Sequence, residues 1–277
     1  MPDTPLDVRA LLGLARMRID PADSELLLAH VLERPRSWLF AHADATPSGD
    51  ERERFEDVVA RRARGEPVAY ITGLRGFWSF DLAVTPATLI PRPETELLVE
   101  LALARLPDGT ALDVADLGTG SGAVALAIAS ERPEARVIAT DASAAALEVA
   151  RSNANRLRLT NVRFALGDWC TPLADARFDV IVSNPPYIAE HDRHLVEGDL
   201  RYEPPSALAS GADGLDAIRT IARDAFGRTR PGGWLLLEHG FDQGAAVRAV
   251  LQEAGWCDVE TARDLEHRDR VTFGRRN

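Results

Sequence analysis

The segment Asn184-Pro185-Pro186-Tyr187 carries the groups best suited to chemistry in this chain. Its two prolines fix their φ angles and remove two backbone N–H donors, which leaves a rigid turn with carbonyl acceptors. Asn184 adds an amide oxygen and Tyr187 adds a flat ring. Together these groups can hold a planar –NH₂ group by its two hydrogens and orient its nitrogen for methylation. Asn-Pro and Pro-Pro also end strands, so the segment on its own is compatible with a plain turn.

A glycine-rich turn from Asp116 to Gly122 has the order Gly-x-Gly-x-Gly. Its glycines let the backbone approach a ligand closely, and it lacks the Lys-Ser/Thr pair of a P-loop. Asp141 ends the next predicted strand, where a carboxylate can accept hydrogen bonds from both ribose hydroxyls of an adenosine ligand. Capping the following helix is the other role open to Asp141. The pattern fits either a dinucleotide or S-adenosylmethionine.

Asp168 and Trp169 follow the third predicted strand, at the same carboxyl edge of the sheet. Trp169 can stack against an adenine ring, and Asp168 can accept a hydrogen bond from the adenine amino group. The alternative for Trp169 is a loop tryptophan that covers the sheet edge.

The elements that must position these residues alternate between strand and helix from residue 113 onward. Strands are predicted near 113–117, 137–140, 162–165, 178–183, 233–238, 256–260 and 270–274. Helices are predicted at 122–130, 143–157, 214–229 and 243–254. This alternation predicts an α/β fold with a parallel, doubly wound sheet, and the short link before the last strand suits an antiparallel hairpin. The result is a mixed, Rossmann-like sheet of seven strands. The long loop over 184–213 is expected to be functional.

The first part of the chain has a different pattern. Residues 1–75 predict a small helical domain, with helical spacing of apolar residues and a stop at Gly65-Glu66-Pro67. Alternating apolar residues over 70–90 predict a β-hairpin, and we assign 76–90 as a connector. A helix then opens at Pro91 and runs to about Leu106, so that 91–277 forms the second domain.

Composition limits the function classes. The chain has 277 residues, of which 45% are hydrophobic and 27% charged, which excludes wholesale disorder. No apolar run is long enough for a membrane span, and the first residues lack the features of a signal peptide. With only two cysteines, no disulfide framework is expected, and the cytoplasm is the expected compartment. The net charge of −11 argues against direct nucleic-acid binding. No metal site is expected, since His191 and His194 lack an evident third ligand.

The chain resembles the protein-(glutamine-N5) methyltransferases of the HemK/PrmC type, which modify class I peptide chain release factors. The Asn-Pro-Pro-Tyr motif also occurs in DNA adenine and some RNA methyltransferases, whereas the Pro-Arg-Pro-Glu-Thr-Glu motif is more specific. The resemblance covers nearly the whole chain and rests on the segments 65–71, 91–96, 116–122, 184–187, 201–204 and 237–240.

The resemblance implies a Rossmann-like methyltransferase domain, a helical N-terminal domain that docks the release factor, and S-adenosylmethionine as cofactor. The reaction it implies is N5-methylation of the glutamine in the release factor's Gly-Gly-Gln loop. The catalytic residues would be Asn184, Pro185, Pro186 and Tyr187. The cofactor-binding residues would be Gly118, Thr119, Gly120, Ser121, Gly122, Asp141, Trp169 and Asn184. The position of Asp168 after the third predicted strand adds that residue to this set.

Three alternatives stay open. The first is a glutamine methyltransferase that acts on a ribosomal protein. The second is a nucleic-acid amine methyltransferase, which would need a basic face. The third is an inactive scaffold that binds release factors, although such a protein would be expected to lose Asn184 or the glycines. Arg92 and Glu94 suit either the methionine end of the cofactor or a helix cap, and a structural role is the first choice for His239.

Overall fold

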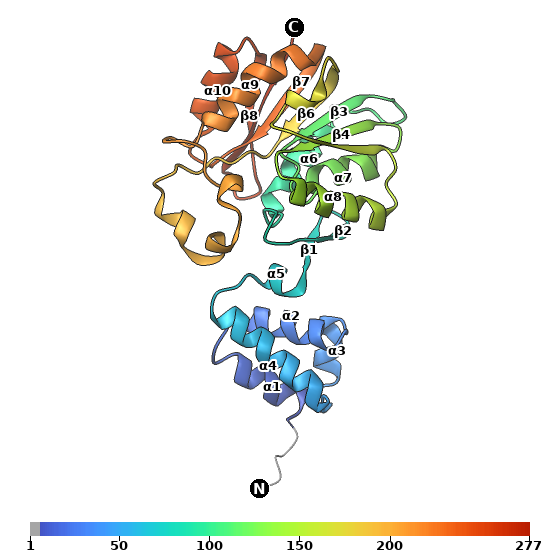
Figure 1. Ribbon diagram of the computed structural model, residues 1–277, viewed down its shortest axis with the longest axis vertical. Coiled ribbons are helices and arrows are strands. Elements are labelled where there is room, and N and C mark those ends of the chain that lie inside the picture. Colours follow the sequence, from blue (N-terminus) through green and yellow to red (C-terminus); the bar gives the residue numbers. More distant parts are fainter. Residues whose placement is uncertain (1–5) are drawn as a thin grey trace. The chain divides into compact units, whose positions relative to one another are not determined.

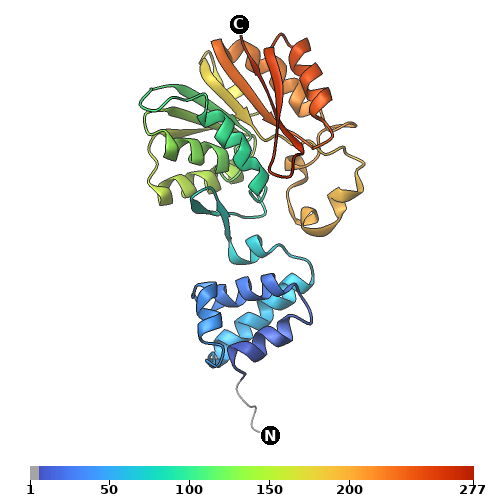
Figure 2. The ribbon, with the colours of Figure 1, turned by 180° about the vertical axis from the view of Figure 1, so that it is seen from behind.

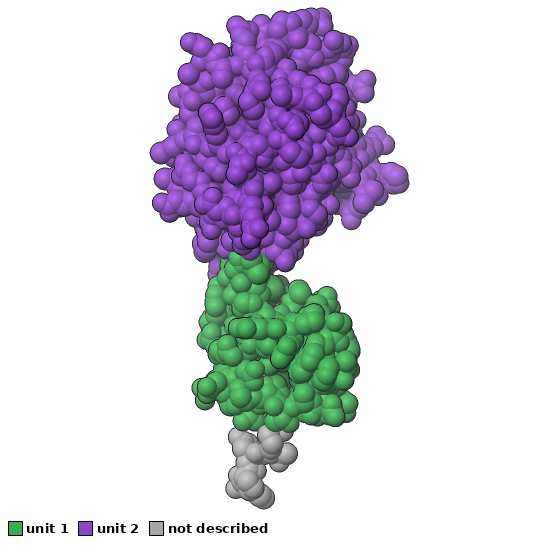
Figure 3. Space-filling view, turned by 90° about the vertical axis from the view of Figure 1, so that its right-hand side faces the viewer, with its two compact units in different colours: residues 1–74 green, residues 75–277 purple. Residues whose placement is uncertain are grey.

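The computed structural model describes residues 6–277 of the chain. Within that part the chain forms two compact units, one ending at Leu74 and the other spanning Arg75–Asn277 (Figure 3). Each unit has an apolar core built from its own residues. Among the described helices, none combines the length and the apolar composition that crossing a bilayer requires.

The first unit is a bundle of short helices, as predicted. Its helices are α1 (Val8–Ala15), α2 (Pro21–Val31), α3 (Arg36–Ala41), α4 (Gly49–Ala63) and α5 (Val68–Thr72). The longest, α4, begins with a capping box in which Ser48 and Glu51 satisfy each other's backbone N–H groups. The prediction that residues 70–72 begin an extended segment was wrong, because Pro67 starts α5 there and Gly73 ends it in the left-handed conformation.

The second unit contains the seven-stranded sheet, in the order β5-β4-β3-β6-β7-β9-β8 (Figure 1). Its strands are β3 (Asp113–Leu117), β4 (Arg136–Asp141), β5 (Val162–Leu166), β6 (Phe178–Ser183), β7 (Thr229–Glu238), β8 (Cys257–Arg263) and β9 (Asp269–Arg275). The first five are parallel, and β9 runs antiparallel to both β7 and β8. The predicted mixed sheet of seven strands is therefore confirmed. The largest difference at a strand end is in β7, which begins at Thr229 rather than near 233.

Alternation along each strand separates two cores, one on each face of the sheet. On one face Val180, Val182 and Leu236 pack with α6 (Glu96–Leu103) and α7 (Ala123–Glu131), and α8 (Ala144–Leu157) also covers this side. On the other face Ile181 and Leu235 pack with α9 (Asp216–Arg228) and α10 (Gly244–Glu253). Figures 1 and 2 show helices on both sides of the sheet. Because β6 and the second half of β7 are buried on both faces, they read as apolar runs, whereas the edge strands β5 and β8 are only partly buried.

A β-hairpin forms in the region where one was predicted, but its strands β1 (Leu74–Phe77) and β2 (Phe80–Ala83) end well before residue 90, and side chains tie it to the helices. Glu96 accepts a hydrogen bond from the backbone N–H of Trp78, and Asn153 exchanges two hydrogen bonds with the backbone of Ala83. The helix predicted from Pro91 to Leu106 is shorter, because a 3₁₀ turn, η1 (Pro93–Thr95), precedes α6.

The long segment over 184–213 contains three short 3₁₀ turns, η3 (Arg193–Val196), η4 (Gly198–Tyr202) and η5 (Pro205–Ala207). A parallel bridge between Ile188 and Ala209 closes it into a loop. The loop therefore leaves β6 and returns close to where it began.

Candidate active site

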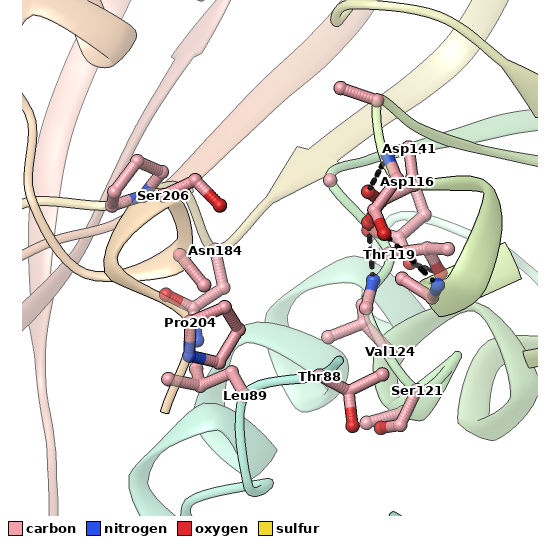
Figure 4. Close-up of a pocket in the computed structure, with 18 of the residues that line it drawn as sticks. Thr88, Leu89, Asp116, Thr119, Ser121, Val124, Asp141, Asn184, Pro204 and Ser206 are labelled. Carbon is pink, nitrogen blue, oxygen red and sulfur yellow. Dashed lines mark hydrogen bonds between the residues drawn. The ribbon is translucent and has the colours of Figure 1, made fainter. Parts of the chain in front are cut away.

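A pocket of about 260 Å³ lies at the carboxyl edge of the sheet, within the second unit. It opens where β3 and β6 are neighbours, because the chain runs outward through β4 and β5 on one side and through β7 on the other. Such a switch point is where open α/β sheets bind ligands. Figure 4 shows Asn184, Pro204 and Ser206 on one side of this pocket and Asp116, Thr119 and Asp141 on the other.

The glycine loop forms the second of these sides. Gly118, Gly120 and Gly122 all have positive φ, at 76°, 56° and 88°. A Cβ at Gly118 would stand 3.0 Å from the ring of Trp169, so a larger residue would both strain the backbone and displace that ring. The chain reverses sharply here because three residues adopt positive φ angles, which glycine tolerates and residues with a Cβ disfavour.

Hydrogen bonds hold this loop in place. The carbonyl of Thr140 accepts from the N–H groups of Gly118 and Thr119 at 2.9 Å. The carboxyl of Asp116, which is 1% exposed, accepts from the hydroxyl of Thr119 at 2.6 Å and from the N–H of Ala125 at 3.2 Å. Burial raises the pKa of Asp116 to about 7. The loop is thus positioned from the ends of β3 and β4.

Asp141 lines the pocket, and its two oxygens accept hydrogen bonds from the N–H groups of Gly120 and Ser143 at 2.9 and 2.8 Å. Ser143, rather than Asp141, caps α8 through its hydroxyl. A carboxylate has about four acceptor positions, so Asp141 can hold the glycine loop and still accept from hydroxyl groups of a ligand.

Asp168 and Trp169 also line the pocket. The carbonyl of Trp169 accepts from the hydroxyl of Thr140 at 3.0 Å, and the residue has a φ of 42°. Its ring lies against Gly118 and packs partly on the core beneath α9 and α10. The ring therefore both covers the sheet edge and presents a surface to the pocket, so the two interpretations of Trp169 are compatible.

The Asn-Pro-Pro-Tyr segment leaves the end of β6 directly into the pocket wall. Asn184 and Pro186 line the pocket, whereas Pro185 is buried and Tyr187 packs its side chain against the core. The –NH₂ group of Asn184 donates to the hydroxyl of Thr95 at 3.1 Å. Burial raises the pKa of Tyr187, so its phenol stays protonated at neutral pH. The amide of Asn184 thus has a fixed partner on one side.

The structure brings nine of the predicted residues into one lining: Gly118, Thr119, Gly120, Ser121, Asp141, Asp168, Trp169, Asn184 and Pro186. Gly122, Pro185 and Tyr187 stand behind that surface. Gly122 begins α7, where a Cβ would meet the side chains of Leu126 and Ala150.

Sequence reasoning assigned no role to several residues of the wall. Thr95 and Asp116 line the pocket, as do Leu89 and Pro204. They stand in or beside the Pro-Arg-Pro-Glu-Thr-Glu, glycine-loop and Arg-Tyr-Glu-Pro motifs, so these motifs could have indicated that the residues belong to the site. The spacing of those motifs could not show that they meet, because more than 100 residues separate Thr95 from Pro204 in the chain.

A buried ion pair joins two parts of this wall. Glu203, whose side chain is fully buried, pairs with Arg92 and accepts from the N–H of Ile90 at 3.0 Å. The pair joins the segment after the hairpin to the long loop. Arg92 is outside the pocket lining, so its side chain supports the wall rather than facing the ligand space.

The histidines singled out from the sequence lie elsewhere. His239 is buried between the carbonyl of Gly240 and the hydroxyl of Thr272, and burial lowers its pKa. The ring of His194 is hydrogen-bonded to the neighbouring Asp192. In the described part of the chain, no group of three or more His, Cys, Asp or Glu residues is arranged to hold a metal ion.

Two family models match this chain. The methyltransferase small domain matches residues 94–212, and the PrmC N-terminal domain matches residues 7–73. A solved structure of the T. thermophilus 16S rRNA N2 G1207 methyltransferase, in complex with AdoMet and guanosine, is similar at a TM-score of 0.56 and 21% identity. That similarity covers 74% of this chain and 50% of the other, and it supports the fold alone.

Relatives in sequence are much closer. The release factor glutamine methyltransferase of Xylella fastidiosa (strain Temecula1) is 59% identical over 266 residues, which is 96% of this chain and 97% of that protein. The protein of the same name from Escherichia coli (strain K12) is 47% identical over 253 residues, or 91% of each chain. With both family models, the pocket and relatives that span nearly its full length, this chain belongs to the family of release factor glutamine methyltransferases.

Proposed function

We propose that this protein transfers a methyl group from S-adenosylmethionine to the side-chain nitrogen of the glutamine in the Gly-Gly-Gln motif of peptide chain release factors. Membership of the family supports the reaction and the substrate. The structural observation that carries the proposal is the direction of the hydrogen bond between Asn184 and Thr95. The –NH₂ group of Asn184 is used by Thr95, so its amide oxygen is free to accept a hydrogen bond from a substrate –NH₂ group.

The residues of the glycine-loop side fit the cofactor. Asp141 retains acceptor capacity for two ribose hydroxyls, and Trp169 presents a ring against which an adenine can stack. Asp168 beside it can accept from the adenine amino group. When bound, S-adenosylmethionine supplies an electrophilic methyl group on its sulfonium. The loop and Asp141 would orient that methyl group toward Asn184 across the pocket.

The residues of the opposite side would hold the substrate. The oxygen of Asn184 accepts one hydrogen of the glutamine amide, and the backbone carbonyl of Pro185 is the expected acceptor of the other. Tyr187 is the predicted contact for the planar group; because it stands behind the pocket lining in this structure, it supports the turn from beneath. Because the lone pair of an amide nitrogen is delocalised, this grip favours rehybridisation toward the methyl donor. The nitrogen becomes strongly acidic once methylated, so water can take its proton and no buried base such as His239 is required.

Class I release factors are the proposed partners, docked by the helical domain of residues 1–75. Met17 and Phe40 are 75% and 64% exposed in that domain, and such apolar side chains can contact a protein partner. With a net charge of −11, we expect no direct binding of nucleic acid. The cytoplasm, where release factors act in translation, is the expected compartment.

Labelled S-adenosylmethionine and a purified release factor test the reaction directly. We expect one methyl group per molecule, located by mass spectrometry on the glutamine of the Gly-Gly-Gln motif. A release factor with that glutamine changed to alanine should receive no label. Label on a ribosomal protein or on RNA, with none on the release factor, would instead support one of the alternatives.

Full-length enzyme with Met17→Glu and Phe40→Glu tests the docking role. Methylation of the intact release factor should fall, while methylation of a short Gly-Gly-Gln peptide should stay close to that of the unchanged enzyme. Equal rates on the intact protein would exclude docking through these side chains.

A further inference from the structure

Glu238, the last residue of β7, is a buried acid that the proposed reaction does not use. Glu238 is only 1% exposed, and its Oε2 atom has no hydrogen-bond partner in the described part of the chain. Burying a carboxyl group with an unsatisfied oxygen costs free energy, and such groups in native proteins need a reason. Glu238 does not line the pocket, so a direct contact with the ligands is not that reason.

The sheet brings Glu238 beside the catalytic turn. β6 and β7 are parallel neighbours, and Ser183 is paired with Leu237. One residue further along each strand stand Asn184 and Glu238. Thr95 in η1, which is 3% exposed, lies between them: its hydroxyl accepts from the Asn184 –NH₂ group at 3.1 Å, and its hydrogen bonding toward the Glu238 carboxyl works to lower the pKa of that carboxyl.

This chain of contacts decides which way the Asn184 amide points. A hydroxyl group has one hydrogen to donate. If Thr95 donates it to Glu238, the hydroxyl can only accept from Asn184, so the –NH₂ group of Asn184 faces Thr95 and its oxygen faces the other way. Without Glu238 as acceptor, Thr95 can donate to the Asn184 oxygen instead, and the amide can turn over.

We propose that Glu238 is a positioning residue that, through the hydroxyl of Thr95, holds the amide oxygen of Asn184 toward the methyl-accepting nitrogen. This proposal rests on the proposed function, because it explains how that function's hydrogen-bond acceptor is kept in place. It also assigns a role to Thr95 within the Pro-Arg-Pro-Glu-Thr-Glu motif.

The charges around Glu238 are compatible with an acceptor role at slightly alkaline pH. Burial and the nearby Glu94 raise its pKa to about 7, while hydrogen bonding with Thr95, Arg270 on β9 and Arg92 oppose that shift. Tyr187, whose pKa is raised in part by Glu238, stays neutral. At pH 8 most of the Glu238 carboxyl is therefore ionised and can only accept hydrogen bonds.

Single-turnover methylation of a release factor at pH 8 and saturating S-adenosylmethionine tests the link. We expect Glu238→Met, which removes the acceptor oxygens at similar side-chain length, and Thr95→Val each to lower the rate at least about tenfold, because a misplaced acceptor costs more in rate than in binding. Thr95→Ser, which keeps the hydroxyl, should retain most of the rate. Cofactor affinity should be preserved in all three variants, and Glu238→Met should not lower the melting temperature.

The double variant Glu238→Met/Thr95→Val separates a relay from two independent effects. If Glu238 acts through Thr95, the double variant should be no slower than Thr95→Val alone. Multiplied losses, a native rate in Glu238→Met, or a rate loss matched by lost cofactor affinity would each overturn the proposal.

A measurement independent of activity keeps this proposal distinct from the proposed function. The side-chain amide of Asn184, labelled with ¹⁵N and assigned by its disappearance in Asn184→Ala, should show a hydrogen-bonded proton in the native enzyme. We expect that signature to be lost in both Glu238→Met and Thr95→Val. Its persistence in Glu238→Met would overturn the positioning role. A native enzyme that leaves the release factor unmethylated would overturn only the proposed function.

Discussion

The two sides of the pocket are built in different ways. The glycine-loop side comes mostly from one stretch, Asp116 to Ala146, to which Asp168 and Trp169 are added, and backbone N–H groups and carbonyls do most of its positioning. The Asn184 side is assembled from residues far apart in the chain, with Thr95, Pro204 and Glu238 beside the Asn-Pro-Pro-Tyr turn. A local, backbone-built site tolerates the loss of one side chain better than a side built from a few long-range side-chain contacts.

The largest effect should follow from Asn184→Ala. Methyl transfer should fall by about 10²-fold or more, because losing one preorganised polar contact to the reacting group typically costs about 2.7–4 kcal/mol of barrier. Cofactor affinity should weaken only modestly, since most of that site lies on the other side. Single-turnover kinetics with a parallel binding titration separates the two, and a native rate would show that the turn merely ends β6.

Asn184→Asp sharpens the same test. It keeps an oxygen acceptor but adds a charge beside the sulfonium and removes the hydrogen bond donated to Thr95. We expect impaired transfer, though less than with Ala, and cofactor binding that is equal or tighter. Transfer at the native rate would mean that any acceptor oxygen is sufficient.

Asp141→Ala probes the opposite side. A charge-assisted hydrogen bond contributes about 1.5–3 kcal/mol, so affinity for S-adenosylmethionine should fall about tenfold or more. The rate of transfer at saturating cofactor should change much less than in Asn184→Ala. Calorimetric titration that finds native affinity in the folded variant would remove the ribose assignment.

Glu203→Gln loosens the wall on the Asn184 side without touching the ligand space. The variant keeps an acceptor for the N–H of Ile90 but loses its ion pair with Arg92. Because Arg92 is partly exposed, we expect a loss of about 1 kcal/mol in unfolding free energy and only a few-fold weaker cofactor binding. Urea unfolding measures the first, and a loss of catalysis as large as that of Asn184→Ala would contradict a purely supporting role.

The last effect concerns stability at different pH rather than the reaction, and here the two sides are alike. Each side has one buried carboxyl group with a pKa of about 7, Asp116 in the glycine-loop side and Glu238 in the Asn184 side. Both values are raised above the ordinary values of 3.8 and 4.5, so the native state holds these protons more tightly than the unfolded chain does. Their stabilising contribution is complete below pH 4 and is lost as the pH rises through 7.

Asp116→Asn should remove one of these contributions. Relative to the native enzyme, its unfolding free energy should improve between pH 5 and pH 8, by at most about 1.4 kcal/mol per pH unit. Glu238→Gln should behave in the same way. Urea titrations at the two pH values test this, and parallel pH dependences in variant and native enzyme would contradict the raised pKa values.

How much of the site could be predicted from the sequence depended on how far apart in the chain the contacting residues lie. The glycine loop, Asp141 and the Asn-Pro-Pro-Tyr turn each follow a strand, so alternation of strand and helix was enough to place them at one edge of the sheet. Family resemblance added the cofactor and substrate. No local pattern indicated that Thr95 contacts Asn184 or that Glu203 contacts Arg92, because those pairs are 89 and 111 residues apart.

The sequence by itself determined the elements and their order: apolar alternation and helical spacing specify the strands and helices, and glycine specifies the sharp turn after β3. Even there, α5 and η1 departed from the predicted boundaries, since proline and glycine decide such ends within one or two residues. Only the tertiary structure decided that Glu238 stands beside Asn184. The reason is physical: register between β6 and β7 is chosen by the packing of both sheet faces, which no single segment of the chain contains.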